Sequence, residues 1–238
     1  MTQTNALGQV IGDPVPNWTP PPFPGRSTLS GRYCRLEPLD PARHSAGLFE
    51  AWAGDAALWT YMPVGPFETE AQYRAYADQM SAGADPQFYT VCEIDSGAPL
   101  GQASYLRVAP AAGSIEVGWI CFSPRLQRSR IATEAMYLMM KNAFDLGYRR
   151  YEWKCNALNQ AWRRAAMRLG LSFEGVFRQA LVSKGHNRDT AWYAAIDAEW
   201  PALRQAFETW LAPENFDENG AQRRSLSELT EPVLVAKG

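Results

Sequence analysis

A basic turn between a predicted strand and a predicted helix carries the most specific chemical signal in the sequence. Residues Ser114–Phe122 are rich in β-branched and aromatic side chains, which predicts a strand. Apolar side chains recur at helical spacing over residues 131–143, which predicts a helix with one apolar face. The first turn of a helix offers unpaired N–H groups and the positive end of the helix dipole. The turn at residues 127–133, with Arg125, Arg128 and Arg130, is therefore predicted to bind phosphate, although a solvated basic loop is the alternative for any single arginine.

Motifs of several other enzyme classes are missing from the sequence. There is no Gly-x-Gly-x-x-Gly, Walker, Gly-x-Ser-x-Gly or His-Glu-x-x-His pattern, so dinucleotide, nucleoside triphosphate, serine hydrolase and zinc protease sites lose their main support. The cysteines are far apart, and each lies in a strand-like run: Cys34, Cys92, Cys121 and Cys155. Buried reduced thiols are expected rather than disulfides. No metal site is predicted, because neither His44 nor His186 is near a cysteine.

Composition limits the class of protein and its partners. A chain of 238 residues can bury a substantial core in one large domain or two small ones. The net charge of −2 argues against general nucleic-acid binding. No apolar run approaches the roughly 18–20 residues of a membrane span. Because the N-terminus lacks the basic and apolar regions of a signal peptide, a cytoplasmic protein without a membrane partner is expected.

Strand and helix patterns fill residues 31–211. Strands are predicted at residues 31–39, 87–95, 100–108, 114–122, 151–155, 172–183 and 190–196, and helices at 41–53, 68–81, 131–146, 160–169 and 200–211. Hairpin-like joins exclude an all-parallel sheet, because parallel neighbours need a long crossover. The prediction is an α+β fold with one mixed, mostly antiparallel sheet of about seven strands and helices on both faces.

Two segments lie outside this single predicted domain. Residues 1–30 form a proline-rich extension around Trp18 and Phe23, which is either a disordered tail or a strap packed on the domain or on a partner subunit. Residues 212–238 are a polar C-terminal tail that is expected to fray. The oligomeric state, including a homodimer, is left open.

The strand, turn and helix resemble the acetyl-CoA site of the GNAT superfamily of N-acetyltransferases. The turn of that family reads Gln/Arg-x-x-Gly-x-Gly/Ala; Gln127 and Ala132 match it, whereas Arg130 stands in place of the central glycine. The Ala-Thr-Glu-Ala continuation at residues 132–135, and Asn159 followed by Leu-Gly-Leu at 169–171, are similar to the branch that contains the ribosomal-protein N-terminal acetyltransferases. The order of elements fits the superfamily from about residue 31 to residue 196.

The resemblance implies acetyl-CoA as co-substrate, with no metal. Its pyrophosphate would lie on the backbone amides of Gln127, Arg128, Ser129, Arg130, Ile131, Ala132 and Thr133. Its pantetheine arm would lie between strands 115–122 and 151–155, with Ile120 and Phe122 as backbone partners and a nearby amide as oxyanion donor. Asn159 is implied to contact this arm, and an N-cap for the following helix is an equally good interpretation.

Glu116 is the first choice for a general base. An ammonium group must lose a proton before it attacks a thioester, and a carboxylate, directly or through water, is the usual acceptor. Strand alternation places Glu116 on one face with Gly118 and Ile120. The alternative is a carboxylate satisfied by a salt bridge. His186 and Asp189 are second choices, for which turn formation at residues 185–189 is the commoner explanation.

Several functions are compatible with these residues. The first is direct transfer of an acetyl group to a primary amine, either a protein N-terminus or a small amine. The second is a CoA-binding sensor or interaction module without chemistry, which is prompted by Arg130 and by Ala166, since many members of the family have a tyrosine acid at the position of Ala166. A third and weaker hypothesis is that the basic turn binds RNA or the ribosome.

Overall fold

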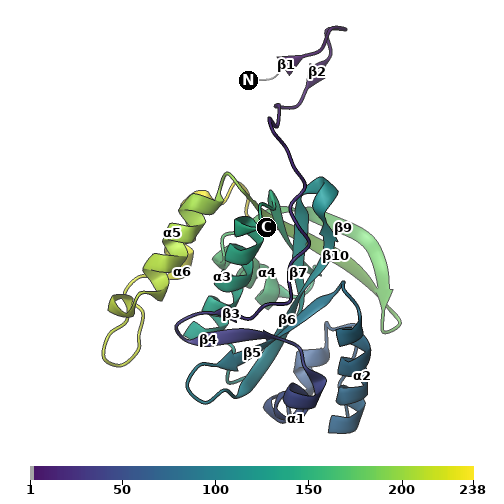
Figure 1. Ribbon diagram of the computed structural model, residues 1–238, viewed down its shortest axis with the longest axis vertical. Helices are drawn as coiled ribbons and strands as arrows, with labels where there is room; N and C mark the ends of the chain where they lie inside the picture. The colour runs from purple at the N-terminus through teal and green to yellow at the C-terminus, as the bar shows by residue number, and fades with distance from the viewer. Residues whose placement is uncertain (1–2) are drawn as a thin grey trace.

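Eight strands form one sheet in the order β3-β4-β5-β6-β7-β8-β10-β9, and every neighbouring pair except β7–β8 is antiparallel (Figure 1). The computed structural model describes residues 3–238. The strands are β3 (Leu29–Ser30), β4 (Cys34–Pro38), β5 (Gln87–Glu93), β6 (Pro99–Ala109), β7 (Ser114–Phe122), β8 (Arg150–Asn156), β9 (Ser172–Ser183) and β10 (His186–Ile196). The predicted α+β class and mostly antiparallel sheet are confirmed. The eighth strand is β3, which pairs the end of the proline-rich segment with β4.

Capping side chains fix where several helices begin. The Asp40 carboxylate accepts the Ala42 N–H before α1, and the Thr69 hydroxyl accepts the Gln72 N–H before α2. The helices are α1 (Pro41–Ala51), α2 (Glu70–Ala82), α3 (Arg130–Asp145), α4 (Gln160–Arg168), α5 (Trp200–Leu211) and α6 (Leu226–Thr230), with short 3-10 helices η1 (Ala56–Trp59), η2 (Pro110–Ala112), η3 (Pro213–Asn215) and η4 (Glu231–Val233). Within residues 3–238, none of the helices combines the length and the apolar character that crossing a membrane requires.

Helices cover both faces of the sheet. Phe88 belongs to an apolar cluster with Leu48 of α1 and Tyr73 of α2. Its neighbour Tyr89 belongs to the main core, together with Met139 of α3 and residues of α5. Because successive strand residues point to opposite faces, the two clusters lie on the two sides of the sheet. The prediction of helices on both faces is confirmed.

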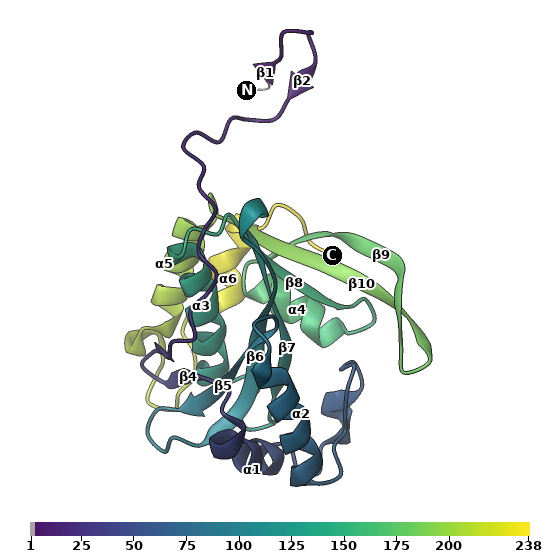
Figure 2. The ribbon, with the colours of Figure 1, turned by 45° about the vertical axis from the view of Figure 1, so that its right-hand side comes forward.

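The hairpin β9–β10 extends beyond the other strands (Figure 2). Its turn consists of Lys184 and Gly185, whose φ angles are 49° and 78°. Two consecutive residues with positive φ form the tight turn that matches the twist of a hairpin. The loop predicted over residues 184–189 was therefore too long, and β10 begins at His186.

The N-terminal segment divides into two parts. Strands β1 (Gln3–Thr4) and β2 (Val10–Ile11) form a small exposed hairpin at the tip of an arm that leaves the domain (Figure 1). Closer to the domain the chain packs as a strap: Pro21 and Pro24 are buried, and the Tyr148 hydroxyl donates to the Pro22 carbonyl at 3.1 Å. Of the alternatives for this segment, packing on the domain describes residues 18–30.

The C-terminal segment is folded against the domain. Leu226 and Thr230 of α6 are fully buried, and the Thr230 hydroxyl donates to the carbonyl of Arg168 at the end of α4. The Asn215 side chain donates to the carbonyls of Trp210 and Arg224. The expectation that residues 212–238 fray was wrong, because a few apolar and hydrogen-bonding side chains anchor an otherwise polar segment.

One buried carboxylate of α3 joins that helix to the start of β4. Glu134 is 5% exposed and accepts N–H groups from Arg32, Tyr33 and Cys34 at 2.8, 2.6 and 2.9 Å. A Cβ atom on Gly31 would lie only 2.4 Å from the carboxyl carbon of Glu134, so a larger residue at that position would displace the carboxylate. The helix that begins at the basic turn is thereby fixed to the sheet.

Candidate active site

Strands β7 and β8 are paired over only part of their length. Parallel pairing ends at Val117↔Trp153; beyond this point β7 continues beside β6, and β8 continues beside β10. One extra β7 residue lies between the pairs Gly118↔Ser104 and Cys121↔Gln102, and Trp119 there has a φ of 51°. This is a β-bulge, which bends a strand, and strained backbone of this kind concentrates at functional sites. A gap therefore opens inside the sheet.

A cavity of about 1480 Å³ occupies this gap. One part, the α3 half, is lined by the turn before α3, by α4 and by the C-terminal segment. The other part, the hairpin half, is lined by residues between 55 and 63, by Glu116 and by the facing side chains of β9 and β10. The two halves are continuous, so a ligand in one half can meet a ligand in the other.

The start of α3 has the geometry of a phosphate site. The Ser129 hydroxyl accepts the Ala132 N–H at 3.0 Å and so caps the helix. Arg130 and Ile131 are the first two residues of α3, and their N–H groups have no acceptor within the helix. The Gln127 amide donates to the Phe122 carbonyl at 2.9 Å, which fixes the turn to the end of β7. Free N–H groups and the helix dipole thus face the α3 half.

Most of the predicted cofactor residues meet at this cavity. Those that line it are Ile120, Phe122, Gln127, Arg128, Ser129, Arg130, Ala132, Thr133 and Asn159. The exception is Ile131, whose side chain packs against the main core. An apolar residue on the inner face of a helix belongs there, and only the Ile131 N–H remains available at the helix start.

Arg130 fits the turn because its side chain points away from it. As the first residue of α3, Arg130 has a φ outside the left-handed region, so the conformation does not require glycine. Its guanidinium lies 4.1 Å from the centre of the Phe216 ring and 5.7 Å from that of Tyr33. Cation–π contacts with these rings hold the side chain beside the C-terminal segment.

The Arg130 contact can be tested by unfolding in urea. We expect Arg130→Ala to lower the free energy of unfolding by about 1 kcal/mol, because a partly desolvated cation–π contact is lost. Arg125→Ala is the control, since its guanidinium is exposed and pairs with Glu93 at 2.7 Å, and such surface pairs contribute about 0–1 kcal/mol. The loss for Arg130→Ala should shrink when Phe216 is already leucine; an unchanged loss would contradict the contact.

Asn159 caps α4, one of its two predicted roles. Its side-chain oxygen accepts the Trp162 N–H at 3.1 Å. The side chain is also buried and lines the α3 half. The capping role is therefore observed, and contact with the pantetheine arm stays a prediction.

Glu116 lies in the hairpin half between two cations. It is 3% exposed, and both of its oxygens accept from Arg107 Nη1 at 2.8 Å. On the other side, Lys154 Nζ is 2.7 Å from Glu116 Oε2. The alternative interpretation, a carboxylate satisfied by salt bridges, is therefore observed. Glu116 also lines the cavity, and its role as a general base stays a prediction. Within residues 3–238 the cavity is lined by one other carboxylate, Asp55.

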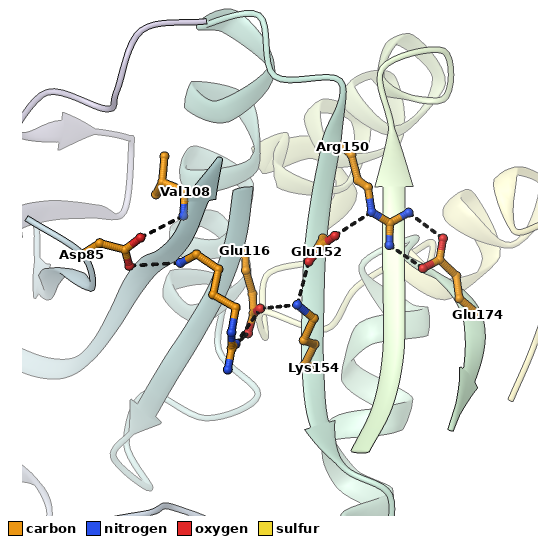
Figure 3. Close-up of polar contacts among 8 residues, drawn as sticks. Asp85, Val108, Glu116, Arg150, Glu152, Lys154 and Glu174 are labelled. Atoms are coloured by element: carbon orange, nitrogen blue, oxygen red, sulfur yellow. Dashed lines mark hydrogen bonds and ion pairs between the residues drawn. The ribbon is translucent and has the colours of Figure 1, made fainter. Parts of the chain in front are cut away.

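The ion pairs continue across the sheet from Lys154 (Figure 3). Lys154 also pairs with Glu152 at 2.8 Å, Glu152 pairs with Arg150 at 2.7 Å, and Arg150 pairs with Glu174 of β9. Burial alone would raise the pKa of Glu152, but hydrogen bonds from Lys154 and Arg150 lower it below its usual value. Lys154 Nζ also lies 3.7 Å from the centre of the Trp192 ring. These ion pairs and the cation–π contact thus fix the positions of the charged side chains.

Sequence reasoning missed Arg168 in the α3 half. Its Nη1 donates to the Thr133 hydroxyl at 3.2 Å, and its guanidinium lies 5.0 Å from the centre of the Trp210 ring. Burial lowers the pKa of Arg168. Its contact with Trp210 depends on the position of α5, which no local sequence pattern reveals.

Sequence reasoning also missed the polar side chains of β10 that face the hairpin half. Arg188, Thr190 and Trp192 line the cavity. Their alternating positions place them on one face of the strand. This alternation was the available signal, but residues 184–189 had been predicted as a loop.

The second-choice bases lie elsewhere on the hairpin. His186 is exposed, and neither His186 nor Asp189 is among the residues that line the cavity. The Asp189 carboxylate accepts the Gln179 N–H at 2.7 Å and the Asn187 amide at 3.0 Å. The Gln179 N–H lowers the pKa of Asp189. Asp189 therefore stabilises an irregularity of β9 from within β10, and the predicted turn at residues 185–189 was wrong for this residue.

The cysteines are buried free thiols, as expected. Burial raises the pKa of Cys155, which lines the cavity, to about 11. Among the described residues, one group has its potential metal-ligand atoms within 4.8 Å of one another: Glu37, His44 and Cys92. Arg43 pairs with Glu37 at 2.8 Å, and this positive neighbour disfavours a cation there.

Comparison with known families agrees with this geometry. The model of the acetyltransferase (GNAT) domain family matches residues 34–172, which is more than half of the chain. The chain belongs to the GNAT acetyltransferase family. It is accordingly an acetyl-CoA-dependent acyltransferase with the family's fold. The matched segment contains the split between β7 and β8, the basic turn and α4.

Known GNAT proteins resemble this chain over most of its length. A GCN5-related N-acetyltransferase from Brucella melitensis is 46% identical, with a TM-score of 0.89, and the match covers 91% of this chain and all of that chain. The uncharacterized N-acetyltransferase YnaD of Bacillus subtilis is 23% identical over 150 residues, which are 63% of this chain and 86% of YnaD.

The predicted likeness to ribosomal-protein acetyltransferases is found at the level of the fold. RimL, a ribosomal alpha-N-protein acetyltransferase, has a TM-score of 0.61 and is 20% identical, and the match covers 71% of this chain and 94% of RimL. At this identity the likeness concerns the fold alone.

Proposed function

We propose that this GNAT acetyltransferase transfers the acetyl group of acetyl-CoA directly to a primary amine. The observation that supports this most strongly is the continuous cavity, which joins the phosphate-type site at α3 to the buried carboxylate of Glu116. A donor in the α3 half and an amine in the hairpin half would meet at the split between β7 and β8.

The α3 half fits coenzyme A in its chemistry. The N–H groups at the start of α3, with Arg128 and Arg168, would hold the phosphates. The gap between the strands, with Ile120 and Asn159, would take the pantetheine arm. Bound there, acetyl-CoA supplies an acetyl thioester.

Glu116 would accept the proton that the amine loses, directly or through a water molecule. Its ion pairs with Arg107 and Lys154 fix the position of the carboxylate beside the cavity. A covalent acetyl-cysteine is disfavoured, because burial raises the pKa of Cys155 to about 11 and keeps this thiol protonated at neutral pH. Attack by the amine itself is therefore the simpler route.

Two observations favour a second candidate, a CoA-binding sensor or interaction module without turnover. Both cationic partners of Glu116 are already in contact with it, and Ala166 stands where many family members have an acid. Release of CoA thiol with any amine would contradict this candidate, whereas tight cofactor binding without release would support it.

Thermal unfolding with and without acetyl-CoA tests whether the protein binds this cofactor, which both candidate functions require. Acetyl-CoA at 100 times its dissociation constant should add about 2.7 kcal/mol to the free energy of unfolding. For a chain of this length this corresponds to a rise in Tm of roughly 5–10 °C. Acetate at the same concentration is the control and should leave Tm unchanged. An unchanged Tm with acetyl-CoA would contradict both candidates.

A further inference from the structure

Three side chains on one face of β10 offer unused hydrogen-bond donors to the hairpin half. They are Arg188, Thr190 and Trp192, which line the cavity at alternating positions of the strand. The Arg188 Nε, Thr190 Oγ1 and Trp192 Nε1 atoms are buried, and none has a hydrogen-bond partner within residues 3–238. Buried polar groups are almost always paired, so a row of three unpaired ones calls for a ligand.

The charged side chains around this row include a cation without a paired carboxylate. Arg107 and Lys154 share the carboxylate of Glu116, whereas Arg188 has no carboxylate in salt-bridge contact among the described residues. Glu116 attracts Arg188 only from a longer range, and burial lowers the pKa of Arg188. A guanidinium that is half-buried and unpaired is matched best by a carboxylate or another oxyanion.

The same surroundings suit an amine acceptor. Positive charge nearby disfavours the ammonium form of a bound amine, and so favours the neutral form that can attack. The walls add apolar surface: Phe177 stacks on Trp192 with ring centres 4.5 Å apart, and Leu58 and Met62 also line the cavity. The hairpin half therefore offers oxyanion recognition beside an apolar surface.

Hydrogen bonds join the β9–β10 hairpin to the segment that contains η1. Lys184, at the tip of the hairpin, donates to the carbonyls of Trp59 and Gly65 at 2.7 and 3.0 Å. Both segments contribute side chains that line the hairpin half. Because the two segments are held together, a small molecule fits between them more readily than a polypeptide chain.

We propose that the acceptor is a small amine that carries a carboxylate and an apolar side chain, and that Arg188 and Thr190 bind this carboxylate. The inference rests on the proposed acetyl transfer and specifies its substrate class. Arg188 and Thr190 are then binding residues that set specificity, and Glu116 keeps the separate task of taking the proton.

Paired amines test this inference. Phenylalanine and leucine would each be compared with the amine that lacks the carboxylate, phenethylamine or 3-methylbutylamine, by measuring release of CoA thiol. We expect kcat/KM to be about tenfold or more higher for the amino acids, because the decarboxylated amine leaves a buried cation unpaired. Most of the difference should appear in KM.

Variants of Arg188 and Thr190 test whether these side chains cause the preference for amines with a carboxylate. In Arg188→Gln the preference for the amino acids should fall about tenfold or more, because kcat/KM drops much more for the amino acids than for the decarboxylated amines. Thr190→Val should show a smaller loss of the same kind, and Arg188→Lys should restore part of the preference. Arg178→Gln, an exposed arginine on β9 outside the cavity, is the control and should keep the preference. The rise of Tm with acetyl-CoA shows that each variant is folded.

The possible negative results distinguish between failure of this inference and failure of the proposed function. Equal kcat/KM within each pair, or equal losses on both amines in Arg188→Gln, would overturn the inference and leave the proposed function intact. Faster acetylation of peptide N-termini than of any amino acid would overturn the small-molecule assignment. If no amine of any kind released CoA thiol, the proposed function would fail, and the inference with it.

Discussion

Glu116→Gln is expected to lower kcat/KM by about 100-fold or more, which is the usual contribution of a positioned general base. Glutamine keeps the size of the side chain but cannot take a proton. The loss should appear mainly in kcat, and it should be largest where the amine acceptor is fully protonated. Steady-state release of CoA thiol, measured from pH 6 to 10 with a fixed amine, is the appropriate assay.

The salt bridges of Glu116 require a matched control. Glu152→Gln also removes a carboxylate partner of Lys154, but Glu152 is not among the residues that line the cavity. A much smaller loss in Glu152→Gln would assign the effect to the proton acceptor rather than to disturbance of the ion pairs. If Glu116→Gln kept its turnover at every pH, the assignment of Glu116 as base would be wrong.

Glu134→Ala should have the largest effect on stability. Its carboxylate accepts three backbone N–H groups that precede or begin β4, and alanine would leave them without a partner. Each unsatisfied buried donor costs about 1–3 kcal/mol, so the total loss is expected to be about 3–5 kcal/mol. Thermal unfolding should show a decrease in Tm of roughly 10 °C or more.

Two further variants separate this effect from a simple loss of charge. Asp145→Ala removes a carboxylate from the same helix, but Asp145 is exposed and pairs with Lys141 on the surface, so a change below about 1 kcal/mol is expected. Glu134→Gln keeps one acceptor oxygen and should lie between the two. Equal Tm values for Glu134→Ala and Asp145→Ala would show that the hydrogen bonds from β4 to Glu134 do not stabilise the fold.

Local patterns in the sequence were sufficient for the basic turn and for α3, although not for Arg168. The basic turn and the apolar face of α3 both depend on residues close together in the chain, and the structure places both beside the predicted strand β7. The class of fold followed from the same kind of pattern. Glu116 could also be picked out, because a carboxylate in an apolar strand stands out against its neighbours.

The hairpin half depends on contacts between distant residues. Whether Arg188 is paired or unpaired depends on which carboxylates the fold brings near it, and no spacing in the sequence contains that information. The position of Arg130 depends in the same way on Phe216, which lies in a segment that its polar composition marked as frayed. Tertiary contacts decided both cases.

The limited pairing between β7 and β8 divides the sheet into two parts, one on the β7 side and one on the β8 side. These parts are joined by only four residue pairs among the described strands, from Ser114↔Arg150 to Val117↔Trp153. Glu116 lies within this paired stretch of β7, and its ion pair with Lys154 of β8 connects the two parts of the sheet. The carboxylate proposed to take the proton therefore also helps to set the distance between the two parts. The chemistry and the width of the site thus depend on the same side chain.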